Sequence, residues 1–477
     1  MKERIIAGIV CLFLVAQLKG ISQTAGERRL TLKQCVDAAI NNNLQVRQSD
    51  LQMQAAGVNL KQAKSNILPD LSGNLGHGFN QGRSIDPFTN SYINQQINFA
   101  NYSLSSTVVL FNGFQLKNLI KQNSLSYEAN KMDLQQTKDN VTLNVILAYV
   151  QILNNEEQLQ QSYNSAEVTR KQVQRLTVMN EAGAIPPSQL YDLRGQLAND
   201  EITIVNNRNA LNAAKLSLAQ LMNVPFESNV VVEKVPVDTL QQYNTDPKAL
   251  YDASVRQLAI VKAAELRTQS ALKSVQVAKG ISYPTVGLSG SFNTNYSNAA
   301  TKEIFVNSQE VPSGDYVSLN GSKVPVMTTR QNYTSQKIGY GDQFNNNYNT
   351  SLFLSIQVPI LNRFRAKNRI ALAKIDVRNA EVVAETVKTQ LSQNIEEAYF
   401  NMTAASEKYQ TLQRQVADFS ESFRTAEVRF NAGAINQVDY LIAKNNVDRA
   451  NANLISTKYD YIFRLKILDY YQGKLSL

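Results

Sequence analysis

Few residues of this 477-residue chain have the types that enzyme chemistry needs. The only histidine is His77, and the only cysteines are Cys11 and Cys35. A Ser/His/Asp or Cys/His arrangement needs a histidine beside its nucleophile, and a zinc site needs several His and Cys ligands. The sequence has no glycine-rich phosphate loop either. We therefore predict no enzymatic activity, no cofactor and no metal site, and we interpret His77 as a residue near a lipid interface or a loop.

The N-terminus has the pattern of a secretory signal peptide. Lys2 and Arg4 precede a largely apolar run, 5–18, and small residues follow it before Gln23. This is the order of a basic segment, an apolar segment and a cleavage site. A run of fourteen residues is too short to span a bilayer as a helix. We assign residues 1–22 as a signal peptide, and a short membrane anchor is the alternative.

The charge and cysteine content of the mature chain argue against nucleic acid binding and against an internal disulfide. The formal net charge is +9, and removal of the signal peptide lowers it to about +7. The excess is spread along the sequence without a run of five Lys and Arg, which gives little support for nucleic acid binding. Cys35 is then the one cysteine left, so the mature chain can form no internal disulfide. We interpret Cys35 as a small apolar residue on a helix face.

The chain contains a duplicated segment. Identical residues recur after 215 positions near the start of each copy: Asp37, Ala38, Ala63, Lys64 and Pro69 match Asp252, Ala253, Ala278, Lys279 and Pro284. Farther along the offset is 250: Leu104, Ser105, Asn112, Phe114 and 182–185 match Leu354, Ser355, Asn362, Phe364 and 432–435. We predict a first structural repeat at 23–235 and a second at 236–477. The 35-residue difference between the offsets falls in one polar loop, where insertions cost little.

Each repeat is predicted to contain one long helix, at 113–181 and at 363–431. In the second, apolar residues alternate steps of three and four from Ile370 to Phe430, with one stutter. This is a coiled-coil seam of about eight heptads, and such a helix is about 100 Å long. Gly183 and Gly433 follow the two helices, as expected of glycine just past a helix C-terminus.

Shorter helices accompany the long ones. We expect opening helices at 31–66 and 247–281, and closing helices at 187–222 and 437–471. Two helices of about 36 residues, placed end to end, match one long helix in length. Each repeat can therefore form one continuous helical column beside one broken column.

Four segments with a period of two lie between the opening and the long helices, at about 69–80, 101–111, 284–293 and 349–360. Apolar residues on one face alternate with small polar residues on the other, as in a strand between two media. About ten residues suffice for a membrane strand. The stretches 81–100 and 294–348 are predicted to be polar loops. A soluble hairpin packed on the helices is the alternative. Four strands have open edges, so in a membrane they must pair with further copies.

In the order and spacing of these elements the chain resembles the TolC-like outer-membrane efflux family over nearly the whole mature sequence. The matching features are Leu30-Thr31-Leu32, Asp37, Ala38, 41–43, Pro69, Pro284, 110–114, 360–364, 182–185 and 432–435. The resemblance implies a mainly α fold with a membrane β-barrel portion. A homotrimer would form a 12-stranded barrel and a long coiled-coil helical tunnel.

The resemblance also implies the function and the partners. We expect an outer-membrane exit duct that extends into the periplasm. It would be passive, and an inner-membrane transporter would drive it through a periplasmic adaptor protein. The alternative is a periplasmic coiled-coil adaptor or structural protein, which would need no strands.

In that family the glycine turns form the periplasmic entrance and contact the adaptor, which assigns these roles to Gly183 and Gly433. Aspartates shortly after the second turn narrow and charge the entrance. Asp439 matches the first of these positions, whereas Ile442 replaces the second. The corresponding positions in the first repeat are Gln189 and Asp192. We hypothesise that Asp439 and Asp192 make a negative entrance in a trimer; alternatively, both are solvated acids that favour the helix dipole.

Overall fold

The computed structural model describes residues 29–85, 90–94, 96–226, 230–234 and 246–474, so the predicted signal peptide lies outside the described residues. The chain divides into two compact units. The first comprises Met1–Ala56, Tyr127–Arg267 and Ala380–Leu477, and the second comprises Gly57–Ser126 and Thr268–Asn379. Both units take segments from both copies of the duplication. The division of the sequence at 235–236 stays a prediction about the repeat.

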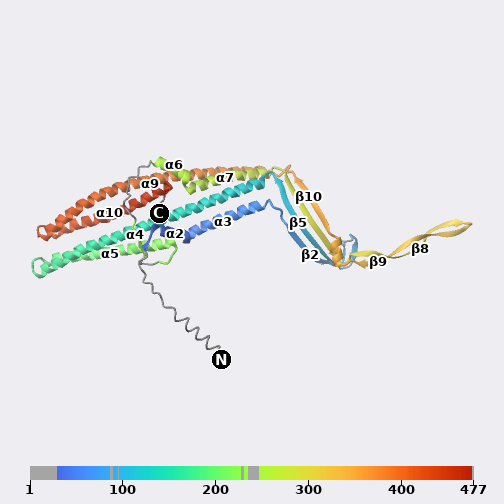
Figure 1. The fold of residues 1–477 in the computed structure, drawn as a ribbon, viewed down its shortest axis with the longest axis horizontal. Helices are drawn as coiled ribbons and strands as arrows, with labels where there is room; N and C mark the ends of the chain where they lie inside the picture. The colour runs from blue at the N-terminus through green and yellow to red at the C-terminus, as the bar shows by residue number, and fades with distance from the viewer. Residues whose placement is uncertain (1–28, 86–89, 95, 227–229, 235–245, 475–477) are drawn as a thin grey trace, which may run out of the picture. The chain divides into compact units, whose positions relative to one another are not determined.

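Two helices of 67 residues dominate the fold, α4 (Gln115–Glu181) and α9 (Arg365–Asn431). Each turns back into a shorter helix, α5 (Pro187–Met222) or α10 (Gln437–Tyr471), as Figure 1 shows. All eighteen residues of the predicted seam in α9 are buried or half-buried. The period of three and four is therefore confirmed as the side of α9 that packs against its neighbours.

The two opening helices are broken, which corrects the prediction of one helix in each repeat. The first consists of α2 (Leu32–Asn42) and α3 (Leu44–Ser65). The second consists of α6 (Pro247–Gln257) and α7 (Ala259–Gly280). Asn43 and Leu258 have extended backbones at the breaks. Each repeat was predicted to have one helical column with a single break, between the opening and the closing helix. The structure adds a second break within the opening helix of each repeat.

Side chains explain the first break. The Oδ1 atom of Asn43 accepts a hydrogen bond from the Gln45 N–H at 2.8 Å, which satisfies an unpaired donor at the start of α3. Asn43 Nδ2 donates to the Leu221 carbonyl at 3.4 Å, and Asn223 Nδ2 donates to the Asn42 carbonyl at 3.3 Å. The break thus meets the end of α5, and polar side chains replace the missing helical hydrogen bonds.

The largest apolar core cluster among the described residues lies between helices of the first unit. Tyr149 of α4 is 1 % exposed and donates to the carbonyl of Glu233 at 2.6 Å, next to the two-residue parallel pair of β1 (Arg29–Leu30) and β6 (Val231–Val232). Cys35 lies in this core, fully buried, as its interpretation as an apolar helix residue requires. Burial raises the pKa of the Cys35 thiol to about 11, so it stays protonated and unreactive at neutral pH.

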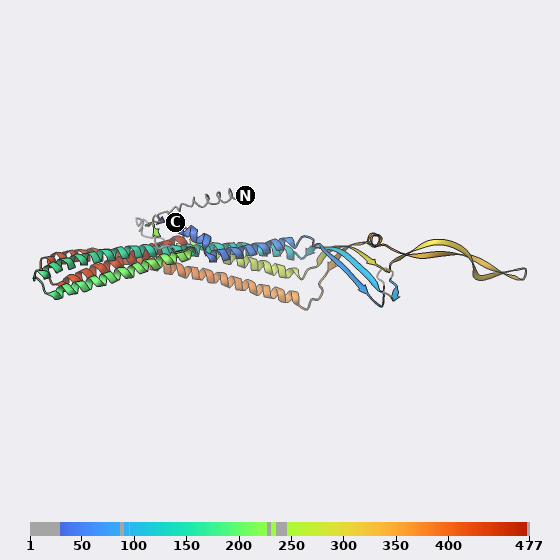
Figure 2. The ribbon, with the colours of Figure 1, turned by 90° about the horizontal axis from the view of Figure 1, so that it is seen from below.

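The second unit contains a four-stranded antiparallel sheet in the order β10-β7-β5-β2 (Figure 2). The strands are β2 (Ser72–Asn80), β5 (Ile97–Asn112), β7 (Thr285–Ser297) and β10 (Asn349–Gln357). Residues in register across the sheet share a face. Phe353 and Val109 lie on the polar face, but the register gathers most of the apolar residues on the other: Leu75, Phe79, Leu104, Val108, Val286, Leu288, Phe292, Leu352, Leu354 and Ile356. His77 lies on the same face of the sheet as Leu75 and is exposed.

The segment predicted as a long polar loop is mostly a hairpin. It contains β8 (Thr301–Leu319), β9 (Ser322–Lys337) and the helix α8 (Tyr340–Asn346). Asn320 and Gly321 both have positive φ at the tip, as a two-residue Asn-Gly turn requires. The other loop contains a shorter hairpin of β3 (Arg83–Ile85) and β4 (Tyr92–Asn94). Both loop predictions are wrong at these residues.

A buried glutamine fixes the base of the β8–β9 hairpin. Gln343 is 1 % exposed, accepts from the Ser297 N–H and donates to the carbonyls of Ser297 and Ile338, each at 2.9 Å. The amide thereby satisfies the backbone where the chain leaves β7 and where it returns from β9.

The strands join the long helices through left-handed residues in both repeats. Gly113 and Phe114 have φ of 62° and 61°, and Arg363 and Phe364 have φ of 53° and 60°. A Cβ atom on Gly113 would lie 2.7 Å from the carbonyl oxygen of Gly280. Glycine is therefore required at this position both for its φ and for the close approach of α7.

We expect Gly113→Ala to lower the free energy of unfolding by about 2 to 3 kcal/mol, since the new methyl group overlaps backbone in a left-handed conformation. Gly183→Ala is the matched control. Gly183 has φ of 74° but no atom within 4 Å of the added Cβ, so its cost is about 1 kcal/mol. Denaturant titrations of both variants measure the difference; equal losses would contradict the close-approach argument.

Candidate functional site at the glycine turns

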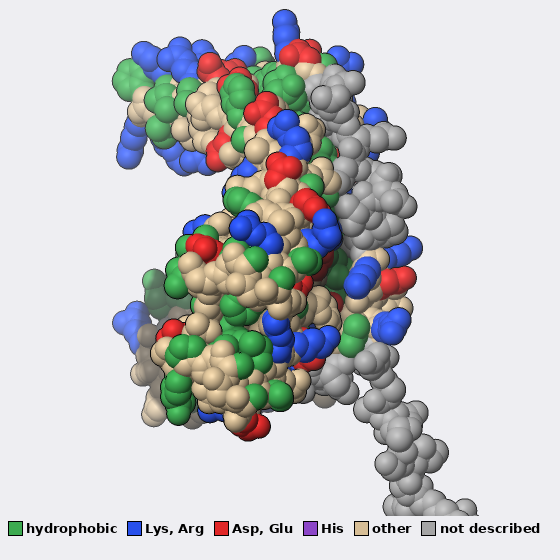
Figure 3. All heavy atoms as spheres, turned by 90° about the vertical axis from the view of Figure 1, so that its left-hand side faces the viewer, with side chains coloured by type: hydrophobic (Ala, Val, Ile, Leu, Met, Phe, Trp, Pro, Cys, Tyr) green, Lys and Arg blue, Asp and Glu red, His purple; other side chains and the backbone are tan. Residues whose placement is uncertain are grey.

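Both glycine turns close the long helices in the same way. Gly183 and Gly433 have φ of 74° and 73°. The N–H of Ala184 donates to the Met179 carbonyl at 2.8 Å, and the N–H of Ala434 donates to the Arg429 carbonyl at 2.8 Å. This six-to-one hydrogen bond satisfies carbonyls at the helix end, and it needs a left-handed residue that glycine supplies without strain. The turns are exposed, and the end of the molecule that faces the viewer in Figure 3 carries hydrophobic side chains among charged ones.

The turns of the two repeats pack against each other inside the first unit. Tyr440 of α10 is fully buried and stacks on Phe430 of α9 with ring centroids 4.6 Å apart. Leu176, Leu190 and Leu193 of the first repeat complete the same cluster. The guanidinium of Arg175 also donates to the side chain and the carbonyl of Asn431. The two turns therefore form one packed end.

The predicted site residues lie on the helices that follow the turns. Asp439 is exposed in the first turn of α10, where its N–H donates to Asn436 Oδ1 at 2.9 Å. Ile442 is 53 % exposed. On α5, Asp192 is exposed and Gln189 is half-buried.

A groove brings together some of these residues. Asp439 and Ile442 line a groove of about 640 Å³ between α9 and α10, together with Asp418, Glu421 and Arg429. Asp192 and Gln189 are not among its lining residues. Within one chain the structure thus places the two predicted acids on separate surfaces, and only assembly of several copies could combine them in one ring.

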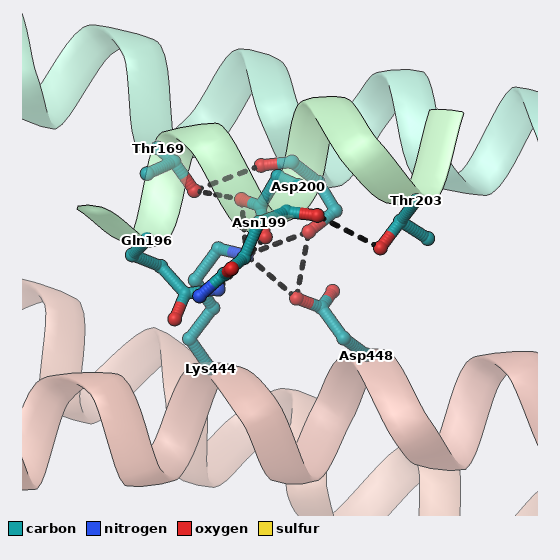
Figure 4. A network of polar contacts seen from close by, with 8 residues as sticks. Thr169, Gln196, Asn199, Asp200, Thr203, Lys444 and Asp448 are labelled. Carbon is teal, nitrogen blue, oxygen red and sulfur yellow. Dashed lines mark hydrogen bonds and ion pairs between the residues drawn. The ribbon is translucent and has the colours of Figure 1, made fainter. Parts of the chain in front are cut away.

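Sequence reasoning missed a buried polar network deeper in the same unit (Figure 4). Lys444 of α10 has a side chain that is 2 % exposed, and its Nζ lies 3.1 Å from Asp200 Oδ2 and 2.7 Å from Asp448 Oδ2. Lys444 Nζ also donates to Ser165 Oγ of α4 at 2.6 Å. The lysine therefore joins α4, α5 and α10, which come from both repeats.

The carboxylate of Asp200 has further partners. The hydroxyl of Thr169 donates to its Oδ2 atom, and Gln196 Nε2 donates to its Oδ1 atom at 2.8 Å. Ser165 Oγ donates to Asp448 Oδ2 at 2.7 Å. Such complete hydrogen bonding is what a buried ion pair needs to be tolerated. One signal in the sequence could have shown it, since Lys444 interrupts the buried stripe of α10 between Tyr440 and Val447.

Other kinds of site are not found in the described residues. Groups of three or more His, Cys, Asp and Glu side chains that could hold a metal ion do not occur among them. Of the helices in this part of the chain, none has the length and apolar character required to cross a membrane.

Comparison with known proteins identifies the family. The profile of the outer membrane efflux protein family matches residues 35–224 and 250–469. The chain is 21 % identical to the outer membrane protein TolC of Escherichia coli strain K12 over 436 residues, which cover 90 % of this chain and 80 % of the relative. It is 22 % identical to TolC of Vibrio cholerae over 482 residues, with 98 % and 95 % coverage.

Solved structures share the fold at low identity. CusC has a TM-score of 0.75 at 16 % identity, with 95 % of both chains covered. The CmeC outer membrane channel of Campylobacter jejuni has a TM-score of 0.70 at 14 % identity, with 93 % of this chain and 86 % of that chain covered. The family profile covers both repeats and most of the described helices and strands. The chain therefore belongs to the outer membrane efflux protein family.

Proposed function

We propose that three copies of this chain form a passive exit duct across the outer membrane. An inner-membrane transporter drives export through the duct, and a periplasmic adaptor protein connects the two. The observation that carries this proposal is the four-stranded sheet, which has an apolar face and whose strands are joined to the long helices α4 and α9 and to the shorter helices α3 and α7. A periplasmic adaptor or a structural coiled coil has no use for such a sheet.

The edges of the sheet favour assembly. β10 and β2 are the outer strands, and each pairs with one neighbour only among the described strands. In lipid, an unpaired strand edge leaves N–H and C=O groups without partners, each at a cost of several kcal/mol. Pairing of β10 in one copy with β2 in the next removes every open edge, and three copies supply twelve strands.

The polar face of the sheet suits a water-filled interior. Ser291 Oγ lies 2.8 Å from Ser351 Oγ, and Ser72 Oγ lies 2.8 Å from Ser105 Oγ, in pairs that cross the strands. Small hydroxyl side chains leave space on this face, whereas leucines and isoleucines cover the other. Lipid on the apolar side and water on the polar side match this division.

We place the periplasmic entrance at the glycine turns, where Gly183 and Gly433 contact the adaptor. Asp192 and Asp439, three of each in the trimer, charge this entrance negatively. A ring of carboxylates favours cations over anions. The alternative is that Asp439 is an ordinary solvated acid. Its N–H donates to the N-cap residue Asn436, and an acid in the first turn of α10 interacts favourably with the helix dipole.

Single-channel recording of the purified protein in planar bilayers tests both the duct and its entrance. The wild type is expected to form water-filled channels that prefer cations. In the variant Asp192→Asn with Asp439→Asn, the ratio of cation to anion permeability is expected to fall at least about threefold towards unity because six carboxylates are removed.

The matched control is Asp37→Asn with Asp252→Asn. These acids are also exposed and also correspond between the two repeats. This control is expected to keep the wild-type permeability ratio. An unchanged ratio in the entrance variant contradicts the role of Asp192 and Asp439. A wild-type protein that is monomeric in detergent and forms no channels contradicts the duct itself.

A further inference from the structure

The net excess of positive charge in this protein lies where the strands join the helices of the second unit. Four junction segments, 57–71, 110–126, 268–284 and 358–379, contain twelve Lys and Arg and two acids. The basic residues are Lys61, Lys64, Lys117, Lys121, Lys273, Lys279, Arg363, Arg365, Lys367, Arg369, Lys374 and Arg378. In the rest of the chain, 36 Lys and Arg stand against 37 Asp and Glu. The even spread inferred from the sequence is therefore wrong for the folded chain.

These basic residues have no acidic partners. Across the described residues, none of the twelve forms an ion pair with Asp or Glu, whereas lysines and arginines of the first unit do. Of the two acids in the segments, Asp70 is engaged by strand β5, since its Oδ1 accepts from the Thr107 N–H at 2.6 Å. The surplus positive charge at the junctions is thus not neutralised within the chain.

Helix stability explains only part of the placement. Lys64 and Lys279 lie in the last turns of α3 and α7, where a positive charge favours the helix dipole, but the basic residues at the starts of α4 and α9 gain nothing from it. Lys117 lies in the first turn of α4, and Arg365 and Lys367 lie in the first turn of α9; neither turn contains an acid. Positive charge at a helix N-terminus opposes the helix dipole and costs about 0.3 to 1 kcal/mol per residue. An external anion would convert this cost into an attraction.

The duplication repeats an aromatic and basic pair at these turns. Phe114 and Lys117 in the first repeat correspond to Phe364 and Lys367 in the second. Both phenylalanines have positive φ, which is uncommon for a bulky residue, and they are 60 % and 65 % exposed. Lys367 Nζ lies 5.9 Å from the ring centre of Phe364. The strained backbone thus presents an aromatic ring to the surroundings, with a lysine one helical turn away.

The position of the rings relates this surface to the apolar face of the sheet. The Phe114 ring contacts the edge of the Phe111 ring, with centroids 5.4 Å apart. Phe111 is in register with Val286, which belongs to the apolar face. Along the chain, the apolar face therefore passes into aromatic rings and then into lysines. This is the order of hydrocarbon, interface and headgroups in a phospholipid leaflet.

We propose that this basic surface binds the anionic headgroups of phospholipids in the inner leaflet of the outer membrane. The inference rests on the proposed function, because it needs the strands in the bilayer and the helices in the periplasm. Lys64, Lys117, Lys279 and Lys367 contact the phosphates, and Phe114 and Phe364 lie at the level of the glycerol and upper acyl chains. Four lysines in each copy place twelve around the trimer.

The test uses delipidated full-length protein in detergent, mixed with equal amounts of phosphatidylglycerol and phosphatidylethanolamine and analysed by native mass spectrometry. The wild type is expected to retain phosphatidylglycerol about fivefold over phosphatidylethanolamine, the factor that one basic residue near a lipid surface supplies. The variant Lys64→Gln, Lys117→Gln, Lys279→Gln and Lys367→Gln is expected to retain both lipids within twofold. Arg363, Arg365 and Arg369 stay unchanged, because they line a separate hollow between α4, α7 and α9.

The matched control removes the same charge elsewhere, with Lys33→Gln, Lys171→Gln, Lys248→Gln and Lys408→Gln. These lysines are also exposed but belong to the first unit. The control is expected to keep the fivefold preference. The inference is overturned by a wild type without lipid preference, by a junction variant that keeps it, or by a control that loses it equally.

Channel recordings in phosphatidylethanolamine alone separate this inference from the proposed function. The junction variant is expected to conduct like the wild type there, which also shows that it folds. A conducting wild type that ignores phosphatidylglycerol refutes only the lipid site. Binding of heparin, a soluble polyanion, to the wild type and the junction variant tests whether the surface takes soluble anions in place of lipid headgroups. A wild type that binds heparin but shows no preference for phosphatidylglycerol assigns the surface to soluble anions instead; a wild type that prefers phosphatidylglycerol supports the lipid assignment.

Discussion

Replacement of Lys444 by methionine will lower the free energy of unfolding by about 3 to 5 kcal/mol, the cost of leaving buried carboxylates without their cation. Asp200 and Asp448 both face the Lys444 ammonium, and the Asp200 side chain is 10 % exposed. Methionine has a similar length and fills the space, so the loss of packing is small. The effect should appear in denaturant titrations that follow the helical circular dichroism signal.

A triple variant distinguishes the loss of the ion pair from a loss of packing at position 444. Lys444→Met with Asp200→Asn and Asp448→Asn removes all the charges together, and replacement of a whole buried pair is often neutral. We expect it to recover at least half of the loss. Lys408→Met, at an exposed position of α9, serves as the surface control and should stay within about 0.5 kcal/mol of the wild type. A loss below about 1 kcal/mol for Lys444→Met would show that the network is not needed for stability.

The same variant should change the channel. The network joins α5 and α10 at positions 11 to 17 residues beyond Gly433 and Gly183, so its loss frees the two helices from each other near the proposed entrance. We expect single channels of Lys444→Met to fluctuate between several conductance levels where the wild type shows one. If Lys444→Met lowers the free energy of unfolding but keeps one conductance level, the network serves stability and not gating.

Truncation of Tyr440 to alanine will cost about 3 to 5 kcal/mol, as expected for an aromatic side chain deleted from a packed core. Tyr440 is fully buried, stacks on Phe430 and has a second ring contact with Phe423, at 5.7 Å between centroids. Its removal leaves a cavity between the two turns. The loss is measured as a shift in the denaturant midpoint at constant slope.

Phenylalanine at the same position should have the opposite effect. The buried hydroxyl of Tyr440 has no hydrogen-bond partner among the described residues, and burial raises the pKa of this phenol. Tyr440→Phe removes the unpaired polar atom and keeps the ring, so we expect a gain of about 1 kcal/mol. For Tyr440→Ala, the control is Tyr191→Ala, which removes an exposed tyrosine near the same turns. A destabilised Tyr440→Phe would indicate that the hydroxyl bonds to a water molecule or to another copy of the chain in the proposed trimer.

The long helices could be predicted from the sequence because their signal is local and repeated. Each residue of the α9 seam is three or four positions from the next, and all of them are buried or half-buried in the structure. The strands could be predicted for the same reason, and the register confirms that most of their apolar residues share one face. A periodic pattern averages over many residues, so single exceptions such as Ser106 do not hide it.

The features that could not be predicted depend on single distant contacts. The break at Asn43 rests on hydrogen bonds to residues almost 180 positions away, and Lys444 meets Asp200 across 244 positions. No local period reveals such pairs. The β8–β9 hairpin was different, since Asn320 and Gly321 are a turn signal that the polar composition obscured. The candidate entrance stays a prediction, because its two acids come together only between copies.

The locked base of the β8–β9 hairpin has a consequence for how this protein can change over generations. Gln343 holds the backbone where the hairpin leaves and rejoins the sheet, and the 35-residue difference between the repeats lies beyond that point. Substitutions in the hairpin therefore leave the strands that form the sheet in place. The length and sequence of the hairpin can thus diverge between descendants, while the strands of the sheet inherit theirs unchanged.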